Sequence, residues 1–94
     1  HMRLFLVEGA QAADLIARAC PLDPEALAEG QSKYTFFLND DAGIIDDLIV
    51  TRLGPERFMI VANAGNAETD EAHLRRLGEA FDARIEPLDR VFLA

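Results

Sequence analysis

The sequence has little of several things that would point to a particular chemistry. Its 94 residues include one cysteine, no tryptophan, one tyrosine, and only nine lysines and arginines against 17 acidic residues, which gives a net charge of −8. The single cysteine, Cys20, excludes an intramolecular disulfide and a zinc site built from several thiolates, and it favours a reducing, cytosolic-type compartment. The acidic balance argues against nucleic acid or an anionic membrane surface as partner, because both are polyanionic. The longest apolar runs are a few residues, too short to cross a bilayer.

What is present suits a folded piece of a larger molecule. Half of the residues are hydrophobic, which argues against disorder, and the length allows one domain or part of one. The chain opens on a strand-like run at 4–7 and ends on another at 91–94, whereas domains more often begin and end in polar segments. We therefore expect residues 3–94 to be a partial domain, with His1 and Met2 a possible tag remnant. Exposed edges of these two terminal strands predict self-association.

Hydrophobic periodicity predicts strands grouped between two helices. Apolar residues at helical spacing mark a helix at 10–20, and a second helix begins near Asn66, its expected N-cap, and ends near Phe81. Alternating or short apolar runs predict strands at 4–7, 33–38, 44–53, 58–62, 83–88 and 90–93. The predicted fold class is α+β: a mostly antiparallel sheet with two helices on one face, a ferredoxin-like variant of order β-α-β-β-β-α-β-β.

Two adjacent carboxylates, Asp46 and Asp47, stand inside the apolar strand at 44–53. Because side chains alternate along a strand, Ile44, Asp46, Leu48 and Val50 should share one face, and Ile45, Asp47 and Ile49 the other. One aspartate must then meet an apolar surface, where an unpaired carboxylate is costly unless it serves as an acid, a base or a cation-stabilising group. The alternative interpretation is an edge strand, in which an inward charge blocks pairing with another sheet.

Other polar residues have weaker signals. Asn63 ends an apolar strand before a turn and a helix start, a geometry that suits an anion or an amide-bearing ligand, although asparagine is also a common turn former. Tyr34 could stack on a flat ligand or belong to the core or rim. His73, three residues after Asp70, suggests a solvated helix pair, and Cys20 suggests a small core residue.

Three segments in order resemble the aminomethyltransferases, the folate-dependent T-proteins of the glycine cleavage system. They are Gly-Gln-Ser-Lys-Tyr-Thr-Phe-Phe-Leu-Asn at 30–39, Gly-Ile-Ile-Asp-Asp-Leu-Ile-Val at 43–50 and Arg-Phe-Met-Ile-Val-Ala-Asn-Ala at 57–64. Family members show corresponding runs at these spacings, and the resemblance extends over essentially the whole chain. Because family chains are much longer, the resemblance implies an internal fragment of the folate-binding domain that is inactive alone.

The resemblance also implies roles for individual residues. Asp46 matches the family's catalytic carboxylate, which lies near the reactive nitrogen of the folate and stabilises the cationic species formed as ammonia leaves. Asn63 and Tyr34 match positions that line the folate pocket, and Asp47 would face the other way and be structural. No residue is expected to hold a metal.

The implied reaction uses two partners. An aminomethyl group on the lipoyl arm of the H-protein and tetrahydrofolate give 5,10-methylenetetrahydrofolate, ammonia and the dihydrolipoyl carrier. The expected compartment is the bacterial cytoplasm, or the mitochondrial matrix in a eukaryote. Alternatives are the folate-binding domain of a sarcosine or dimethylglycine oxidase-type enzyme or a demethylase, and a non-catalytic folate-binding protein of iron–sulfur assembly.

Overall fold

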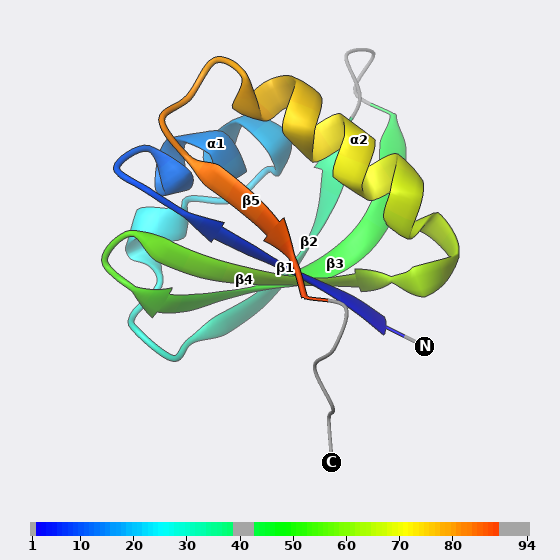
Figure 1. The fold of residues 1–94 in the computed structure, drawn as a ribbon. Helices are drawn as coiled ribbons and strands as arrows, with labels where there is room; N and C mark the ends of the chain where they lie inside the picture. Colours follow the sequence, from blue (N-terminus) through cyan, green and yellow to red (C-terminus); the bar gives the residue numbers. More distant parts are fainter. Residues whose placement is uncertain (1, 39–42, 89–94) are drawn as a thin grey trace.

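The structure is a computed structural model that describes residues 2–38 and 43–88 (Figure 1). It confirms the α+β class, with five strands and two helices among these residues. The strands are β1 (Met2–Glu8), β2 (Ser32–Leu38), β3 (Ile44–Gly54), β4 (Arg57–Asn63) and β5 (Arg84–Pro87). The helices are α1 (Ala12–Ala19) and α2 (Ala67–Gly78), with short 3-10 turns η1 (Pro24–Ala26) and η2 (Ala64–Asn66). The expected strand at 90–93 lies outside the described residues.

The strands form one antiparallel sheet in the order β2-β3-β4-β1-β5, with α1 and α2 over the same face (Figure 1). β1 therefore lies inside the sheet, paired with β4 on one side and β5 on the other. The expectation that residues 4–7 offer an exposed edge is wrong, because both edges of this strand are used. Its companion, residues 91–94, lies outside the described residues. Within the described part of the chain, the edge strands are β2 and β5.

The hydrophobic core lies between the helices and the face of the sheet that they cover. The predicted stripe of α1 is buried, and three phenylalanines, Phe5, Phe37 and Phe58, contribute fully buried rings from three strands. Burying a side chain of this size stabilises the fold by roughly 2–3 kcal/mol. Cys20 belongs to this core, as predicted, and burial raises the pKa of its thiol to about 12. No helix among the described residues is long and apolar enough to span a membrane.

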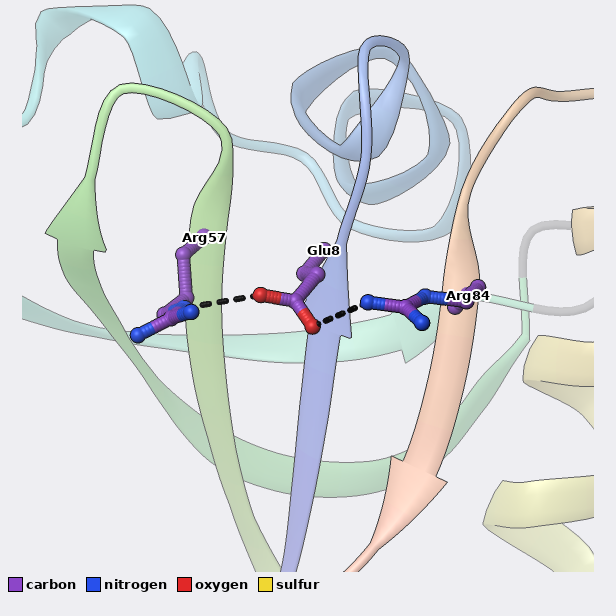
Figure 2. A network of polar contacts seen from close by, with 3 residues as sticks. All are labelled: Glu8, Arg57 and Arg84. Carbon is purple, nitrogen blue, oxygen red and sulfur yellow. Dashed lines mark hydrogen bonds and ion pairs between the residues drawn. The ribbon is translucent and has the colours of Figure 1, made fainter.

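The opposite face of the sheet has no helix over it in the described part of the chain, and we call it the bare face. At one end of this face, Glu8 of β1 joins its two neighbouring strands (Figure 2). Its Oε2 accepts a hydrogen bond from Arg57 Nε of β4 at 2.8 Å, and its Oε1 accepts one from Arg84 Nη2 of β5 at 2.6 Å. These two guanidinium groups, Arg57 foremost, hold the pKa of Glu8 below its ordinary value.

Candidate functional site on the bare face of the sheet

A cavity of about 400 Å³ lies on the bare face, at the end of the sheet opposite to Glu8. It extends across β1, β4, β3 and β2. Its lining includes residues whose side chains alternate onto the bare face and three neighbours from the same strands whose side chains alternate onto the helix-covered face. The first group is Met2, Tyr34, Asp47, Ile49, Val61 and Asn63, and the second is Asp46, Leu48 and Ala62.

Strand register brings Tyr34, Asp47 and Asn63 together at this cavity. Tyr34 is paired with Ile49, and Ile49 with Val61, so these three form one row across the sheet. Asp47 and Asn63 lie in the adjoining row, because Leu48 pairs with Ala62 and the next position in each strand follows. A tyrosine, a carboxylate and an amide from three neighbouring strands therefore meet on one apolar floor.

Asp46 lines the same cavity from the other side of β3. Its side chain is 8% exposed and lies with buried Leu48 and Val50 on the helix-covered face, opposite Phe37 of β2. The lining of the cavity therefore includes all three expected site residues, Asp46, Tyr34 and Asn63. Asp47, which the sequence interpretation left as structural, also lines it, with its side chain alternating onto the bare face.

A β-bulge explains a local departure from the predicted alternation just before Asp46. Phe37 pairs with Asp46 but the next residue, Leu38, pairs with Ile44, so Ile45 is an extra residue in β3. Ile44 is consequently 64% exposed, and Ile45 packs against the core. The alternation predicted the opposite arrangement, with Ile44 on the face of Asp46 and Ile45 on the face of Asp47. Bulges are frequent beside functional sites because they redirect side chains. The edge-strand interpretation is wrong, because β3 lies between β2 and β4.

Asn63 serves the turn and still presents a donor. Its Oδ1 accepts the backbone N–H of Gly65 at 3.0 Å, which confirms the turn-former interpretation. This bond leaves the side-chain NH₂ group for a ligand, and Asn63 is exposed at the cavity. Asn66 occupies the N-cap position of α2, as predicted, although its side chain makes no capping hydrogen bond.

Two further polar residues lie on the inner face of α2, where the sequence interpretation placed a solvated pair. Asp70 is fully buried and His73 is 8% exposed, so that interpretation is wrong. Burial first, and then hydrogen bonding and charge from Asp46, raise the pKa of Asp70 to about 8. A signal for this burial was present: Asp70, His73, Leu74 and Leu77 follow the i, i+3, i+4, i+7 spacing of one helix face. Among residues 2–38 and 43–88, no three carboxylate, imidazole or thiol groups converge as metal ligands would.

Comparison with known proteins gives the family. The model of the GCVT N-terminal domain matches residues 1–93. The chain belongs to the GCVT N-terminal domain family. The crystal structure of glycine cleavage system aminomethyltransferase T from Bartonella henselae matches this fold with a TM-score of 0.91 and 47% identity, over 95% of this chain and 25% of that one.

Curated relatives agree with this assignment. An aminomethyltransferase of Staphylococcus carnosus is 37% identical over 86 residues, which are 92% of this chain and 24% of that protein. An aminomethyltransferase of Synechococcus sp. is 39% identical over 103 residues, covering 100% of this chain and 28% of that protein. The chain thus spans about a quarter of the length of the relatives it matches, and the resemblance drawn from the three sequence segments is confirmed at the level of the family.

Proposed function

We propose that the chain supplies part of the tetrahydrofolate site of an aminomethyltransferase of the glycine cleavage system. The observation that supports this most is the cavity on the bare face, which Asp46, Tyr34 and Asn63 line together in a chain of this family. The proposed reaction transfers the methylene of an aminomethyl group from the lipoyl arm of the H-protein to tetrahydrofolate and releases ammonia. It would take place in a bacterial cytoplasm or a mitochondrial matrix.

The residues at the cavity fit a flat, nitrogen-rich ring. Tyr34 is 80% exposed, so its ring is accessible for stacking, and Ile49 and Val61 give an apolar floor beside it. The NH₂ group of Asn63 can donate to a ring carbonyl or nitrogen, and Asp47 can accept from a ring N–H. Bound tetrahydrofolate would supply the ring nitrogens that take up the one-carbon unit.

Asp46 is the residue that we assign to the chemistry, as the resemblance implies. Its carboxylate lines the same cavity as Tyr34 and Asn63, and loss of ammonia from an aminomethyl group builds positive charge on the carbon and the groups bonded to it. A fixed negative charge at that place stabilises the charge that develops, and it does so more strongly where water is excluded. Asp46 is only 8% exposed, whereas Asp47 is exposed, so the charge of Asp46 is the less screened by water.

The cavity is incomplete in this chain. It is a hollow on one face of a single sheet, and a ligand there would keep one side exposed to water, whereas small-molecule sites normally enclose most of the ligand. The chain spans a quarter of its relatives, so the remaining walls would come from other parts of a longer protein. We therefore expect the 94-residue chain alone to bind tetrahydrofolate weakly or not at all.

The test is to place this chain in a complete enzyme. The homologous quarter of the Bartonella henselae protein, 47% identical, would be replaced by residues 3–88. Ammonia release from an aminomethyl-loaded H-protein would be measured with tetrahydrofolate present, and folding checked by circular dichroism. We expect a folded, active chimera. A folded chimera without turnover, alongside an active parent, would overturn the proposal and direct attention to the oxidase, demethylase and non-catalytic relatives.

A further inference from the structure

The side-chain amide of Asn63 stands at the cavity in a fixed orientation. Its Oδ1 accepts the backbone N–H of Gly65 at 3.0 Å, two residues further along the chain. A backbone N–H can only donate, so the branch of the amide that faces it has to be the oxygen. With the amide turned over, its NH₂ group would meet the Gly65 N–H donor to donor, and the hydrogen bond would be lost. The turn therefore decides which way the Asn63 amide points.

The other branch of the amide is left to the cavity. Asn63 is exposed and lines the cavity, and its Nδ2 takes no part in the hydrogen bond to Gly65. An NH₂ group of this kind donates and does not accept, so at this place the cavity offers a donor only. An asparagine outside such a turn can present either its oxygen or its nitrogen to a ligand, whereas one held by the turn cannot exchange them.

An acceptor lies beside this donor. Asp47 occupies the row of Asn63 on the neighbouring strand β3, with its side chain alternating onto the same face, and its carboxylate can only accept. Side chains directly opposite each other on neighbouring strands have Cβ atoms about 5 Å apart, close enough for one flat ligand to meet both. The cavity therefore distinguishes a ligand that places an acceptor at Asn63 and a donor at Asp47 from a ligand with the reverse arrangement.

We propose that Asn63 is a specificity-determining residue whose amide is positioned as a fixed donor by the N–H of Gly65. The ligand of this cavity must then place a hydrogen-bond acceptor, a carbonyl oxygen or an unprotonated ring nitrogen, against Asn63. Gly65 acts through Asn63 and is a positioning residue. The fixed amide stands on the geometry alone, whereas the identity of the ligand, tetrahydrofolate, rests on the proposed function.

The first test replaces the donor by an acceptor without removing the turn. Aspartate forms the same turn as asparagine, through an oxygen that accepts the N–H two residues on, so Asn63→Asp in the chimeric enzyme keeps the hydrogen bond to Gly65. We expect KM for tetrahydrofolate to rise about tenfold or more, because one hydrogen bond is lost and two acceptors face each other, while KM for the H-protein stays within about twofold. A residue that only forms the turn would leave KM for tetrahydrofolate unchanged, and that result would overturn the proposal.

A charge-matched variant separates the donor from the negative charge that Asn63→Asp adds. Asp47→Asn combined with Asn63→Asp keeps the number of carboxylates at the cavity and reverses the order of donor and acceptor. We expect KM of this double variant for tetrahydrofolate to be at least as high as that of Asn63→Asp alone. A return to KM of the parent chimera would mean that the cavity responds to charge and not to the donor, which would contradict the proposal.

The second test concerns the positioning by Gly65. Gly65→Pro removes the backbone N–H, whereas Gly65→Ala keeps it and adds a Cβ that would lie 3.4 Å from Asn63 Oδ1, an ordinary contact. Without the hydrogen bond the Asn63 amide is free to turn over, so KM for tetrahydrofolate should be several-fold higher in Gly65→Pro than in Gly65→Ala. Equal values in two folded variants would show that Gly65 does not position Asn63.

A measurement on the unmodified 94-residue chain needs neither a ligand nor a proline variant. NMR of the isotope-labelled chain should show a scalar coupling across the hydrogen bond, between the Gly65 nitrogen and the side-chain carbonyl carbon of Asn63. Its absence, in a spectrum that shows such couplings between the paired strands, would contradict the fixed amide. This measurement uses no folate, so an inactive chimera would count against the proposed function and leave the fixed amide standing.

Discussion

Gly9, which follows β1, occupies a backbone conformation that an L side chain rarely adopts. Its φ is +142°, and a Cβ placed there would meet Asp82 O at 2.8 Å and the Cα of Ala83 at 2.9 Å. This close approach brings the 82–83 segment, just ahead of β5, against the turn from β1 to α1, where Gln11 N also donates to Asp82 O at 2.9 Å. Glycine is therefore required at this position for two reasons: the backbone conformation is strained for any other residue, and a Cβ would collide with the 82–83 backbone.

We expect Gly9→Ala to lower the free energy of unfolding by about 2–5 kcal/mol, the sum of backbone strain and of a contact with rigid main chain. Gly30→Ala is the matched control, because Gly30 has φ +85° but a Cβ added to it would have no heavy atom within 4 Å. The control should cost about 1–2 kcal/mol, the conformational part alone. Urea unfolding of both variants measures the difference, and equal losses would show that the contact with Asp82 and Ala83 contributes nothing.

For single residues, the sequence predicts which ones belong to the site better than it predicts which face their side chains occupy. The pattern at 44–53 correctly set Asp46 and Asp47 on opposite faces, but only the covering helices show which face is buried. Tyr34 and Asn63 were identified from a resemblance, and strand register places them in one cavity. Asp70 was missed because a charged residue was assumed to face water, although its spacing from Leu74 and Leu77 lies on the inner stripe of α2.

Among the elements, the Glu8 contacts join three strands at the end of the bare face away from the cavity (Figure 2). The pKa of Glu8 is below its ordinary value of 4.5 in the folded chain, with hydrogen bonding from Arg57 as the largest cause. A carboxylate of this kind stabilises the fold above its unfolded pKa, and the contribution disappears as the pH falls through the folded pKa. Because both arginines are more than half exposed, solvent screens the effect and keeps it modest.

We expect Glu8→Gln to unfold with a smaller dependence on pH below about 4.5 than the original chain, and to be less stable at pH 7. Glu29→Gln, an exposed glutamate in the loop before β2, is the control and should behave like the original chain. Acid unfolding followed by circular dichroism gives the comparison. Identical acid transitions in Glu8→Gln and the original would remove this contact from the account of how β4, β1 and β5 are held together.

The types of the elements follow from the sequence because each has a clear period. Helix α1 shows Ala12, Leu15, Ile16 and Ala19 on one face, and the strands show alternation or short apolar runs bounded by glycine and proline. The bulge at Ile45 and the internal position of β1 do not follow, because both depend on pairing between strands that are distant in the sequence. Local patterns carry no information on such partners.

For the whole molecule, the main feature is a single sheet whose two faces differ: the helix-covered face packs the core, and the bare face carries the candidate site. The covered face contains the hydrophobic core, and the cavity lined by Asp46, Tyr34 and Asn63 opens on the bare face. Because the chain spans only about a quarter of the length of its relatives, we expect segments of a longer protein to complete this site.

The central claim is that the chemistry belongs to the cavity lined by Asp46, and the most direct measurement is the turnover of two variants in the chimeric enzyme. Asp46→Asn removes the charge of the less exposed aspartate, so we expect ammonia release to fall about 100-fold or more, the usual cost of losing an electrostatic contact to the transition state. The asparagine keeps an oxygen that can accept the Asp47 N–H, so the fold should be retained. Asp47→Asn changes the exposed neighbour, and its turnover should fall less than about tenfold. The reverse order, with Asp47→Asn the more damaging of two equally folded variants, would contradict the account.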